Sequence, residues 1–327
     1  MIRKGIVVIS VMLALGTVMV RNSHGIDYPT KPVEIVVTWG PGGTSDLVAR
    51  LIADIGKKYL KQSMFVSNKP GAGGTPAVSD VINSKPDGYK IIYLNNSYFS
   101  ITSQTQKVAF DPYYLVPLIN FTEVRVGLIV KGDSPWKSFA QLAEYAKQNP
   151  GKLVWNHAGR GLGNHIVTLL LMRKYGLQTV DIPYKSSPEQ LSALLGGHAD
   201  ASSMVFAAVV DHVKAKTVRY LVTYGDRRYS VAPDVPTVIE LGSTSLITFS
   251  GIYVHKDTSE DIKRILFEAF KKTYGDPEFK NGMDKIGEGM RFGEPEWIRE
   301  TMRKDEVIAV PILKELGLYE GGYTGKK

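Results

Sequence analysis

The sequence predicts an α/β protein with two lobes, each built from a sheet flanked by helices. Short apolar runs typical of buried strands alternate along the chain with stretches in which apolar residues recur at helical spacing. That alternation is typical of parallel sheets covered by helices on both faces. The chain has 327 residues, which is long for one such sheet, so two α/β domains are expected.

The elements follow from this spacing. The expected strands are the apolar runs at 33–38, 65–66, 89–94, 152–155, 179–182 and 219–223. The expected helices are 45–59, 75–83, 139–146, 164–175, 188–195, 259–274, 277–286 and 296–316. In the first helix, Leu47, Leu51, Ile55 and Tyr59 form the expected inward side. Pro311 should kink or interrupt the last helix, because proline has no N–H for the helical hydrogen bond.

Two further strand-like runs, 122–130 and 247–254, are suited to connect the lobes. Two crossings make the first lobe discontinuous in sequence. We therefore expect residues 26–124 and 250–327 to form lobe 1 and residues 125–249 to form lobe 2.

Residues 1–25 have the pattern of a secretory signal peptide. Arg3 and Lys4 precede an almost wholly apolar run at 5–20, and Ser23 and Gly25 offer small residues to a signal peptidase. The alternative is a membrane anchor, but this run of sixteen residues is short against the roughly 20 that a spanning helix needs. We therefore expect cleavage and export to the periplasm.

The composition excludes several kinds of function. The chain has no cysteine, which excludes disulfides, thiol catalysis and cysteine metal sites. An exported protein without disulfides relies on its core, as a large periplasmic protein does. The formal charge is +8, and the basic residues are scattered along the chain. This modest excess favours anionic solutes and does not indicate nucleic acid.

The first candidate site is the segment 39–46, Trp-Gly-Pro-Gly-Gly-Thr-Ser-Asp, which follows an expected strand and begins an expected helix. Glycines there let the backbone turn tightly and approach a ligand. Free amides and the dipole at the helix start favour an anion such as a carboxylate. Thr44 or Ser45 can cap the helix, and Asp46 can bind backbone amides. A tight turn without a ligand explains the segment equally well.

Three other segments are weaker candidates. The segment 68–75 also leads into a helix, but it lacks the Gly-Lys-Ser/Thr of a P-loop. The alternate glycines of 157–165 are not spaced as in a dinucleotide fingerprint, which leaves either a second helix start for a polar ligand group or a plain loop. Lys185 could pair with an anion, although such a lysine is commonly just solvated, and Asp200 ends a Gly-Gly-His-Ala-Asp segment.

The patterns that mark enzymes are missing from the sequence. It has no Gly-x-Ser-x-Gly nucleophile elbow, and its histidines have no zinc-like spacing. Acidic pairs lie on helices expected at the surface. We therefore expect no catalytic residue, no metal site and no cofactor.

Taken together, these segments resemble the substrate-binding receptors of tripartite tricarboxylate transporters, the Bug family of periplasmic solute-binding proteins. The resemblance begins at Tyr28-Pro29 and runs nearly to the C-terminus. The motifs that carry it are Trp-x-Pro-Gly-Gly-x-x-Asp at 39–46, Asn-Lys-Pro-Gly-Ala-Gly-Gly at 68–74, Lys-Pro-Asp-Gly-Tyr at 85–89, Pro-Gly-Lys-Leu at 150–153, Pro-Tyr-Lys at 183–185, Leu-Gly-Gly-His-Ala-Asp at 195–200 and Pro-Asp-Val-Pro-Thr-Val at 233–238.

The resemblance implies a two-lobed, type II-like Venus-flytrap fold with two crossover strands. It implies capture of a small carboxylated solute, either a di- or tricarboxylate or an aromatic acid, and its delivery to a membrane permease. In such receptors, amides of the first loop hold a carboxylate, and loops of both lobes line the cleft. The candidate ligand-binding residues are therefore Trp39, Gly42, Gly43, Thr44, Asp46, Ser97, Gly161, Gly163 and Asn164, together with Lys185 and Asp200.

Two positions depart from the family pattern. Asn164 stands where a serine is frequent, and Ser186 where a glycine is usual, so the distal contacts of the solute stay open. The expected mechanism is closure of a monomeric receptor about a hinge, with solute contacting both lobes. The alternatives are a receptor whose closed form is presented to a sensor kinase, and a periplasmic hydrolase of a carboxylated substrate.

Overall fold

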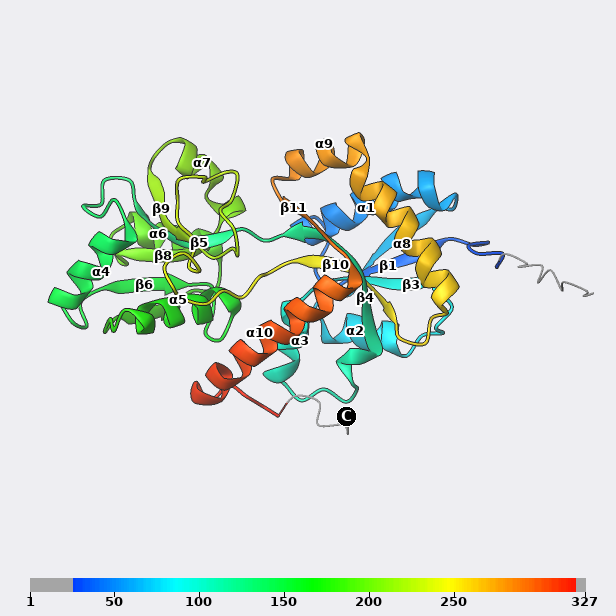
Figure 1. Ribbon diagram of the computed structural model, residues 1–327, viewed down its shortest axis with the longest axis horizontal. Coiled ribbons are helices and arrows are strands. Elements are labelled where there is room, and N and C mark those ends of the chain that lie inside the picture. The colour runs from blue at the N-terminus through cyan, green and yellow to red at the C-terminus, as the bar shows by residue number, and fades with distance from the viewer. Residues whose placement is uncertain (1–25, 322–327) are drawn as a thin grey trace, which may run out of the picture.

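The computed structural model describes residues 26–321, and the predicted signal peptide at 1–25 lies outside the described residues. The described chain forms two lobes side by side, each with one sheet and its own covering helices (Figure 1). This is the two-lobed α/β architecture that the sequence predicts. Within 26–321, no helix is long and apolar enough to cross a membrane.

The sheet of lobe 1 has six strands in the order β11-β4-β10-β3-β1-β2. The strands are β1 (Val33–Val37), β2 (Met64–Asn68), β3 (Lys90–Asn95), β4 (Leu115–Glu123), β10 (Ser250–His255) and β11 (Gly289–Gly293). β1 is parallel to β2 and β3, whereas β10 is antiparallel to β3 and β4. The sheet is therefore mixed, so the expected parallel pairing holds for β1, β2 and β3 but not for β10. Because the returning chain enters beside the end of β3, with Ser250 opposite Asn95, β10 runs the opposite way.

The sheet of lobe 2 has five strands in the order β7-β6-β8-β5-β9. The strands are β5 (Val126–Lys131), β6 (Val154–His157), β7 (Val180–Pro183), β8 (Ala201–Val205) and β9 (Val218–Thr223). β6 is parallel to β7 and β8, and β5 is antiparallel to β8 and β9. This sheet is mixed for the same reason, since β5 brings the chain in from lobe 1. Its helices are α4 (Phe139–Gln148), α5 (Gly163–Lys174), α6 (Ser187–Leu195) and α7 (Val210–Lys214).

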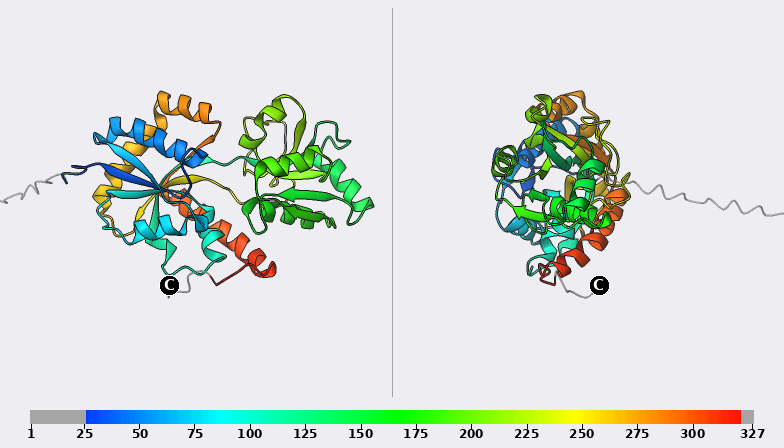
Figure 2. Two further views of the ribbon diagram at one scale, coloured as in Figure 1. Left: turned by 180° about the vertical axis from the view of Figure 1, so that it is seen from behind. Right: turned by 90° about the vertical axis from the view of Figure 1, so that its left-hand side faces the viewer.

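Helices cover both faces of the first sheet (Figures 1 and 2). On one face lie α1 (Thr44–Leu60), α8 (Glu260–Gly275) and α9 (Pro277–Ile286), and on the other lie α2 (Thr75–Ile82), α3 (Ser97–Ser100) and α10 (Pro295–Glu315). Side chains alternate along β1, so Ile35 packs in one core with Ile52 of α1, while Val36 packs in the other with Val78 of α2. Both faces of β1 are buried, which explains its continuous apolar run.

The buried face of α1 matches the expected one in part. Ile55 is buried and Leu51 and Tyr59 pack against the same core, but Leu47 is 43% exposed, and Val48 and Ile52 are buried in addition. Leu51 lies against Gly282 of α9, where an added Cβ would come within 2.6 Å of it. A second helix beside α1 therefore widens its apolar face beyond the side that the sheet covers.

The chain passes between the lobes twice, at 124–125 between β4 and β5 and again just before β10 (Figure 1). Helix α10 makes a third link. It begins on lobe 1, but its last part packs into the main core of lobe 2, with Ile312 and Leu313 in the same cluster as Leu171 of α5. Glu315 near its end forms an ion pair with Arg173 of α5.

Pro311 lies inside α10 without ending it, since the helix continues to Glu315. The residue four positions earlier, Val307, is 71% exposed, and Pro311 is itself exposed. The carbonyl that loses its helical donor therefore faces solvent, where water can replace that donor. Of the two outcomes expected for Pro311, interruption of the helix was wrong.

An ion cluster joins the lobes beside the first crossing. The Arg291 guanidinium on β11 donates to Glu123 at the end of β4 (3.0 Å) and to both carboxylate oxygens of Asp226, which follows β9 in the other sheet (2.7 and 2.8 Å). The side chains of Arg291 and Glu123 are only 11% and 6% exposed. Arg291 also lies over the ring of Trp297, 4.5 Å from its centroid. These contacts fix the edge strand β11 to the crossing.

Replacing Arg291 by Met should lower the free energy of unfolding by about 2–4 kcal/mol, because the buried Glu123 carboxylate loses its main partner. Urea denaturation would measure the loss. The double variant Glu123→Gln/Arg291→Met should recover part of it, since no buried charge then stays unpaired. A double variant as unstable as the sum of the two single variants would contradict this explanation.

Candidate functional site

A cavity of about 190 Å³ lies between the lobes beside the first crossing. Lobe 1, the crossing and lobe 2 all contribute to its wall. The lining residues are Thr44, Ser45, Tyr93, Asn95, Thr122, Val124, Arg125, Val205, Phe206, Ala207, Ser250, Gly287, Glu288 and Gly289. The wall is rich in polar groups, which suits a small hydrophilic ligand.

Three adjacent central strands give the cavity a polar floor. The hydroxyl of Tyr93 on β3 lies 3.3 Å from the hydroxyl of Thr122 on β4, which accepts the Ser250 amide of β10 at 3.1 Å. The Asn95 side chain donates to the Ser250 hydroxyl at 3.2 Å. Burial raises the pKa of the Tyr93 hydroxyl above its usual value, so it stays a neutral donor. The floor thus offers hydroxyl and amide groups that are already held in place.

The start of α1 forms the lobe 1 side of the cavity. Thr44 and Ser45 are its first two residues and line the cavity, while Gly43 is the N-cap. The first i to i−4 bond of the helix joins the Leu47 amide to the Gly43 carbonyl, so the amides before it have no acceptor inside the helix. Gly42 has a φ of 82°, which permits the sharp turn into the helix. The positive end of α1 is therefore directed toward the cavity.

Asp46 organises this loop from within. Its carboxylate is buried and accepts hydrogen bonds from the Gly42 amide (2.9 Å), from Nε of Arg50 (3.0 Å) and from the Asn68 side chain (2.8 Å). Burial alone would raise the pKa of the Asp46 carboxyl, but the hydrogen bonds from Arg50, Gly42 and Asn68 outweigh it and hold the pKa below its usual value. The Gly42 amide is therefore already bonded to Asp46 within the protein.

Asn68 also donates to the Trp39 carbonyl at 2.9 Å, which ties the second glycine-rich segment to the first. The Trp39 side chain is 57% exposed and does not line the cavity. Ser97 lies just behind the floor, where its amide and hydroxyl both donate to the Asn95 side chain at 2.9 and 2.6 Å. Ser97 thus orients a cavity residue and is not itself in the wall.

The predicted residues of lobe 2 are split between two places. Gly163 and Asn164, at the start of α5, line a small pocket of about 10 Å³ against the two crossings, and Val124 is shared by this pocket and the larger cavity. The Asn164 side chain donates to the Ser203 carbonyl of β8 at 3.1 Å. Gly161 instead lies under the end of α10, where an added Cβ would approach Leu318 within 2.6 Å.

The structure does not bring Lys185 and Asp200 into the cavity. Lys185 is exposed, and its amide donates to Glu189 at the start of α6. The Asp200 carboxylate accepts the amide of Val154, the first residue of β6, at 2.9 Å. The helix α5 follows the other end of β6, so Asp200 sits at the opposite edge of that sheet from Gly163.

The sequence reasoning missed several lining residues, above all Arg125 and Glu288. Arg125 lies in the crossing, and Glu288 precedes the edge strand β11. For Arg125, the available signal in the sequence was an arginine between two apolar strands. The sequence gives no signal for Glu288, because only the pairing of β11 with β4 brings it to the cavity.

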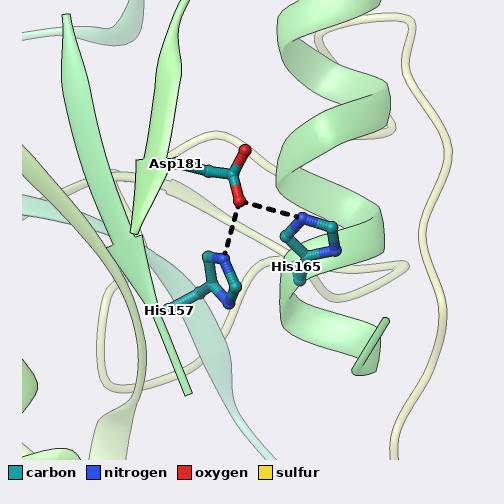
Figure 3. A group of neighbouring side chains, drawn as sticks. All are labelled: His157, His165 and Asp181. Atoms are coloured by element: carbon teal, nitrogen blue, oxygen red, sulfur yellow. Dashed lines mark hydrogen bonds and ion pairs between the residues drawn. The ribbon is translucent and has the colours of Figure 1, made fainter. Parts of the chain in front are cut away.

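A second cluster of polar side chains lies within lobe 2 (Figure 3). Oδ2 of Asp181 on β7 lies 3.1 Å from Nε2 of His157 at the end of β6 and 3.5 Å from Nε2 of His165 on α5. Both histidines are buried, and Trp155 stacks on His165. The possible ligand atoms of the three residues lie within 4.8 Å of one another, a grouping that the histidine spacing in the sequence does not indicate.

The donors around these rings argue against a metal ion. The Gly159 amide donates to Nδ1 of His157 and the Gly161 amide to Nδ1 of His165, each at 3.2 Å. A backbone N–H only donates, so both Nδ1 atoms are unprotonated, and each neutral ring carries its proton on Nε2, facing Asp181. A metal bound at Nε2 would force that proton onto Nδ1, against an N–H group. The cluster fits a hydrogen-bonded anchor for the glycine-rich loop before α5.

This fold, with a polar cavity between two lobes joined by two crossings, is that of a solute-binding receptor. A family model described as "Tripartite tricarboxylate transporter family receptor" matches residues 48–317, and the chain belongs to this family. A Cupriavidus necator protein described as "UPF0065 protein in gbd 5'region" is 32% identical over 324 residues, which cover 97% of this chain and 96% of that protein.

Solved structures of similar proteins share the fold. A TctC solute binding protein from Polaromonas aligns with a TM-score of 0.82 and 26% identity, over 88% of this chain and 99% of that one. Rpa4515 from R. palustris, solved with adipate, aligns with a TM-score of 0.71 and 25% identity, over 89% of this chain and 99% of that one. MatC from Rhodopseudomonas palustris, with bound malate, aligns with a TM-score of 0.66 and 26% identity, over 86% of this chain and 100% of that one. The Venus-flytrap fold implied by the sequence resemblance is thereby confirmed.

Replacing Asp46 by Asn should loosen the first loop, because an amide nitrogen would then face donors from Gly42, Arg50 or Asn68. We expect the free energy of unfolding to fall by about 1–3 kcal/mol in urea denaturation. Asp54→Asn is a matched control, since Asp54 is exposed on the same helix and pairs with the exposed Lys57. Equal losses in the two variants would contradict the role given to Asp46.

The histidine anchor should make stability fall in acid. Burial lowers the pKa of the His157 imidazole, and burial together with the charge of its neighbour His157 lowers that of His165 to about 4. Histidines in the unfolded chain titrate near 6.5, so between pH 6.5 and 4 the unfolded state binds more protons than the folded state. Stability therefore decreases as the pH is lowered through this range. From pH 7 to 5, we expect a loss of more than about 1 kcal/mol from this source.

Denaturation at pH 7 and pH 5 would measure this loss for the wild type and for His165→Gln. The variant should show the smaller difference between the two pH values. Exposed His198→Gln serves as the control for removal of an imidazole. A His165→Gln variant with the full wild-type pH difference would count against the anchor.

Proposed function

We propose that this protein is a periplasmic receptor that captures a small dicarboxylate in the interlobe cavity and delivers it to the membrane permease of a tripartite transporter. The observation that carries this is the start of α1, whose first residues Thr44 and Ser45 line a cavity that lobe 2 also lines. The helix start suits one carboxylate. Membership of the receptor family and the adipate and malate of the two solved relatives support this solute class.

Binding would work by closure of the lobes. We take residues 26–124 with 250–327 as one moving unit and residues 125–249 as the other, with the end of α10, which packs into the core of lobe 2, as a link between them. The solute contacts Thr44 and Ser45 from the first unit and the segment from Val205 to Ala207 from the second. Because each unit holds part of the site, a bound solute stabilises the closed state relative to the open one.

The remaining steps follow from the class of protein. Residues 1–25 would direct export and be removed, and the closed receptor would then present its surface to the permease as a monomer. The protein acts by binding, with no catalytic residue and no cofactor.

A thermal shift assay of the mature protein with adipate and malate tests the proposal. At about 100 times its dissociation constant, a ligand adds about 2.7 kcal/mol, which raises Tm by several degrees. 1,6-Hexanediol, which matches adipate in carbon number but has no carboxylate, should give no shift. If no member of a wider carboxylate panel raises Tm and no carboxylate is retained through gentle purification, the proposal is wrong.

A further inference from the structure

The cavity contains an arginine that has no ion-pair partner among residues 26–321. Arg125 is half-buried in the crossing, and within 26–321 no ion pair to its side chain is found. Nearby Arg291 and Arg227 both pair with Glu123, only two residues earlier in the chain. A half-buried guanidinium without an anion is unfavourable, so it favours an anionic ligand that completes the pair.

A carboxyl group lies beside this cation. Glu288, in the turn between α9 and β11, lines the same cavity and feels the charge of Arg125 without reaching ion-pair distance. Burial raises the pKa of the Glu288 carboxyl to about 7, with Arg125 acting in the opposite direction. Among the described residues, the Tyr93 hydroxyl of β3 also faces Glu288, and Glu123 in the neighbouring strand is occupied by Arg291. Near neutral pH, Glu288 therefore exists in both protonation states.

Gly289 explains how the two groups come to share one wall. A Cβ at this position would lie 2.5 Å from the Glu123 carbonyl and 2.8 Å from Nε of Arg125. Only glycine lets β11 approach β4 this closely while the Arg125 side chain lies across its first residue. The close approach places Glu288 and Arg125 on the cavity together.

Building on the proposed function, we propose that Arg125 binds a carboxylate of the solute and that Glu288 takes up a proton when the solute binds. The start of α1 holds one carboxylate and Arg125 the other, so the site selects dicarboxylates over monocarboxylates. Ionised Glu288 would compete with the solute for Arg125. A solute carboxylate at Arg125 therefore favours the neutral form of Glu288, and the proton comes from solvent.

The sign of the pH dependence follows from this coupling. The bound solute adds negative charge near Glu288 and moves its pKa further up from about 7. Above pH 7 the complex thus holds more protons than the free receptor, and affinity falls as pH rises. Below pH 6, Glu288 is already neutral in the free receptor, so its titration should no longer make the affinity depend on pH.

Isothermal titration calorimetry with adipate and hexanoate tests the proposal on the mature protein. Titrations at pH 7.5 in buffers of different ionisation enthalpy report the protons taken up. The wild type should bind adipate with uptake of a fraction of a proton and should bind hexanoate at least about tenfold more weakly. Glu288→Gln should bind adipate with no uptake. Arg125→Gln should lose at least about tenfold in adipate affinity and little in hexanoate affinity, and Arg125→Lys should restore part of it.

Arg299→Gln, an exposed arginine of α10 paired with Glu296, is the control for loss of a positive charge. Tm of each variant without ligand shows whether it is folded. The inference is overturned if folded Arg125→Gln binds adipate as tightly as the wild type does, or if folded Glu288→Gln takes up as many protons as the wild type does. Either result leaves the proposed function standing. Failure of the wild type to bind any carboxylate overturns both.

Discussion

The guanidinium of Arg291 joins three segments on which the position of the cavity depends. It pairs with Glu123, the last residue of β4 before the crossing, and with Asp226, which follows β9 of the other lobe. It lies on β11, whose pairing with β4 is irregular and short. Edge strands with so few pairings are weakly specified in register, so a buried ion cluster at this point supplies specificity that the strand ladder lacks.

The consequences of that cluster extend into the cavity. Fixing β11 against the crossing places Gly289 over the Arg125 side chain and Glu288 on the cavity wall. The floor needs no such device, because Tyr93, Thr122 and Ser250 lie on neighbouring strands whose pairing already sets their spacing. The site therefore combines a rigid polar floor in the sheet with charged groups whose positions depend on tertiary ion pairs.

The sequence was most informative where the site is local. Segment 39–46 contains the helix start, the turning glycine and Asp46 within eight residues, so the sequence locates this candidate loop, although its spacing fits a tight turn as well as an anion-binding loop. Arg125 and Glu288 could not be found in that way, since they lie far apart in sequence and meet through strand pairing. The same limit applies to His157, His165 and Asp181, where the carboxylate comes from a neighbouring strand. Parallel pairing was correctly expected within each lobe but not for β10 and β5, because strand-helix alternation does not reveal the direction of a strand that enters from the other lobe.

Closure of the lobes acts within constraints that the three links impose. The crossing at Arg125 and the return before Ser250 lie side by side, since the Val124 amide donates to the Thr248 carbonyl, and the end of α10 is packed into the core of lobe 2 through Ile312 and Leu313. Hinge motion is absorbed by a few residues at element termini, and groups close to the hinge move least. In the closure proposed above, Arg125 and Glu288 would lie beside the hinge, so their charges would act on the solute in the open form as well as in the closed form. Val205 to Ala207, which line the cavity from the other lobe, would complete the site on closure. Electrostatic selection would then precede closure, and packing by lobe 2 would add the energy that holds the closed state.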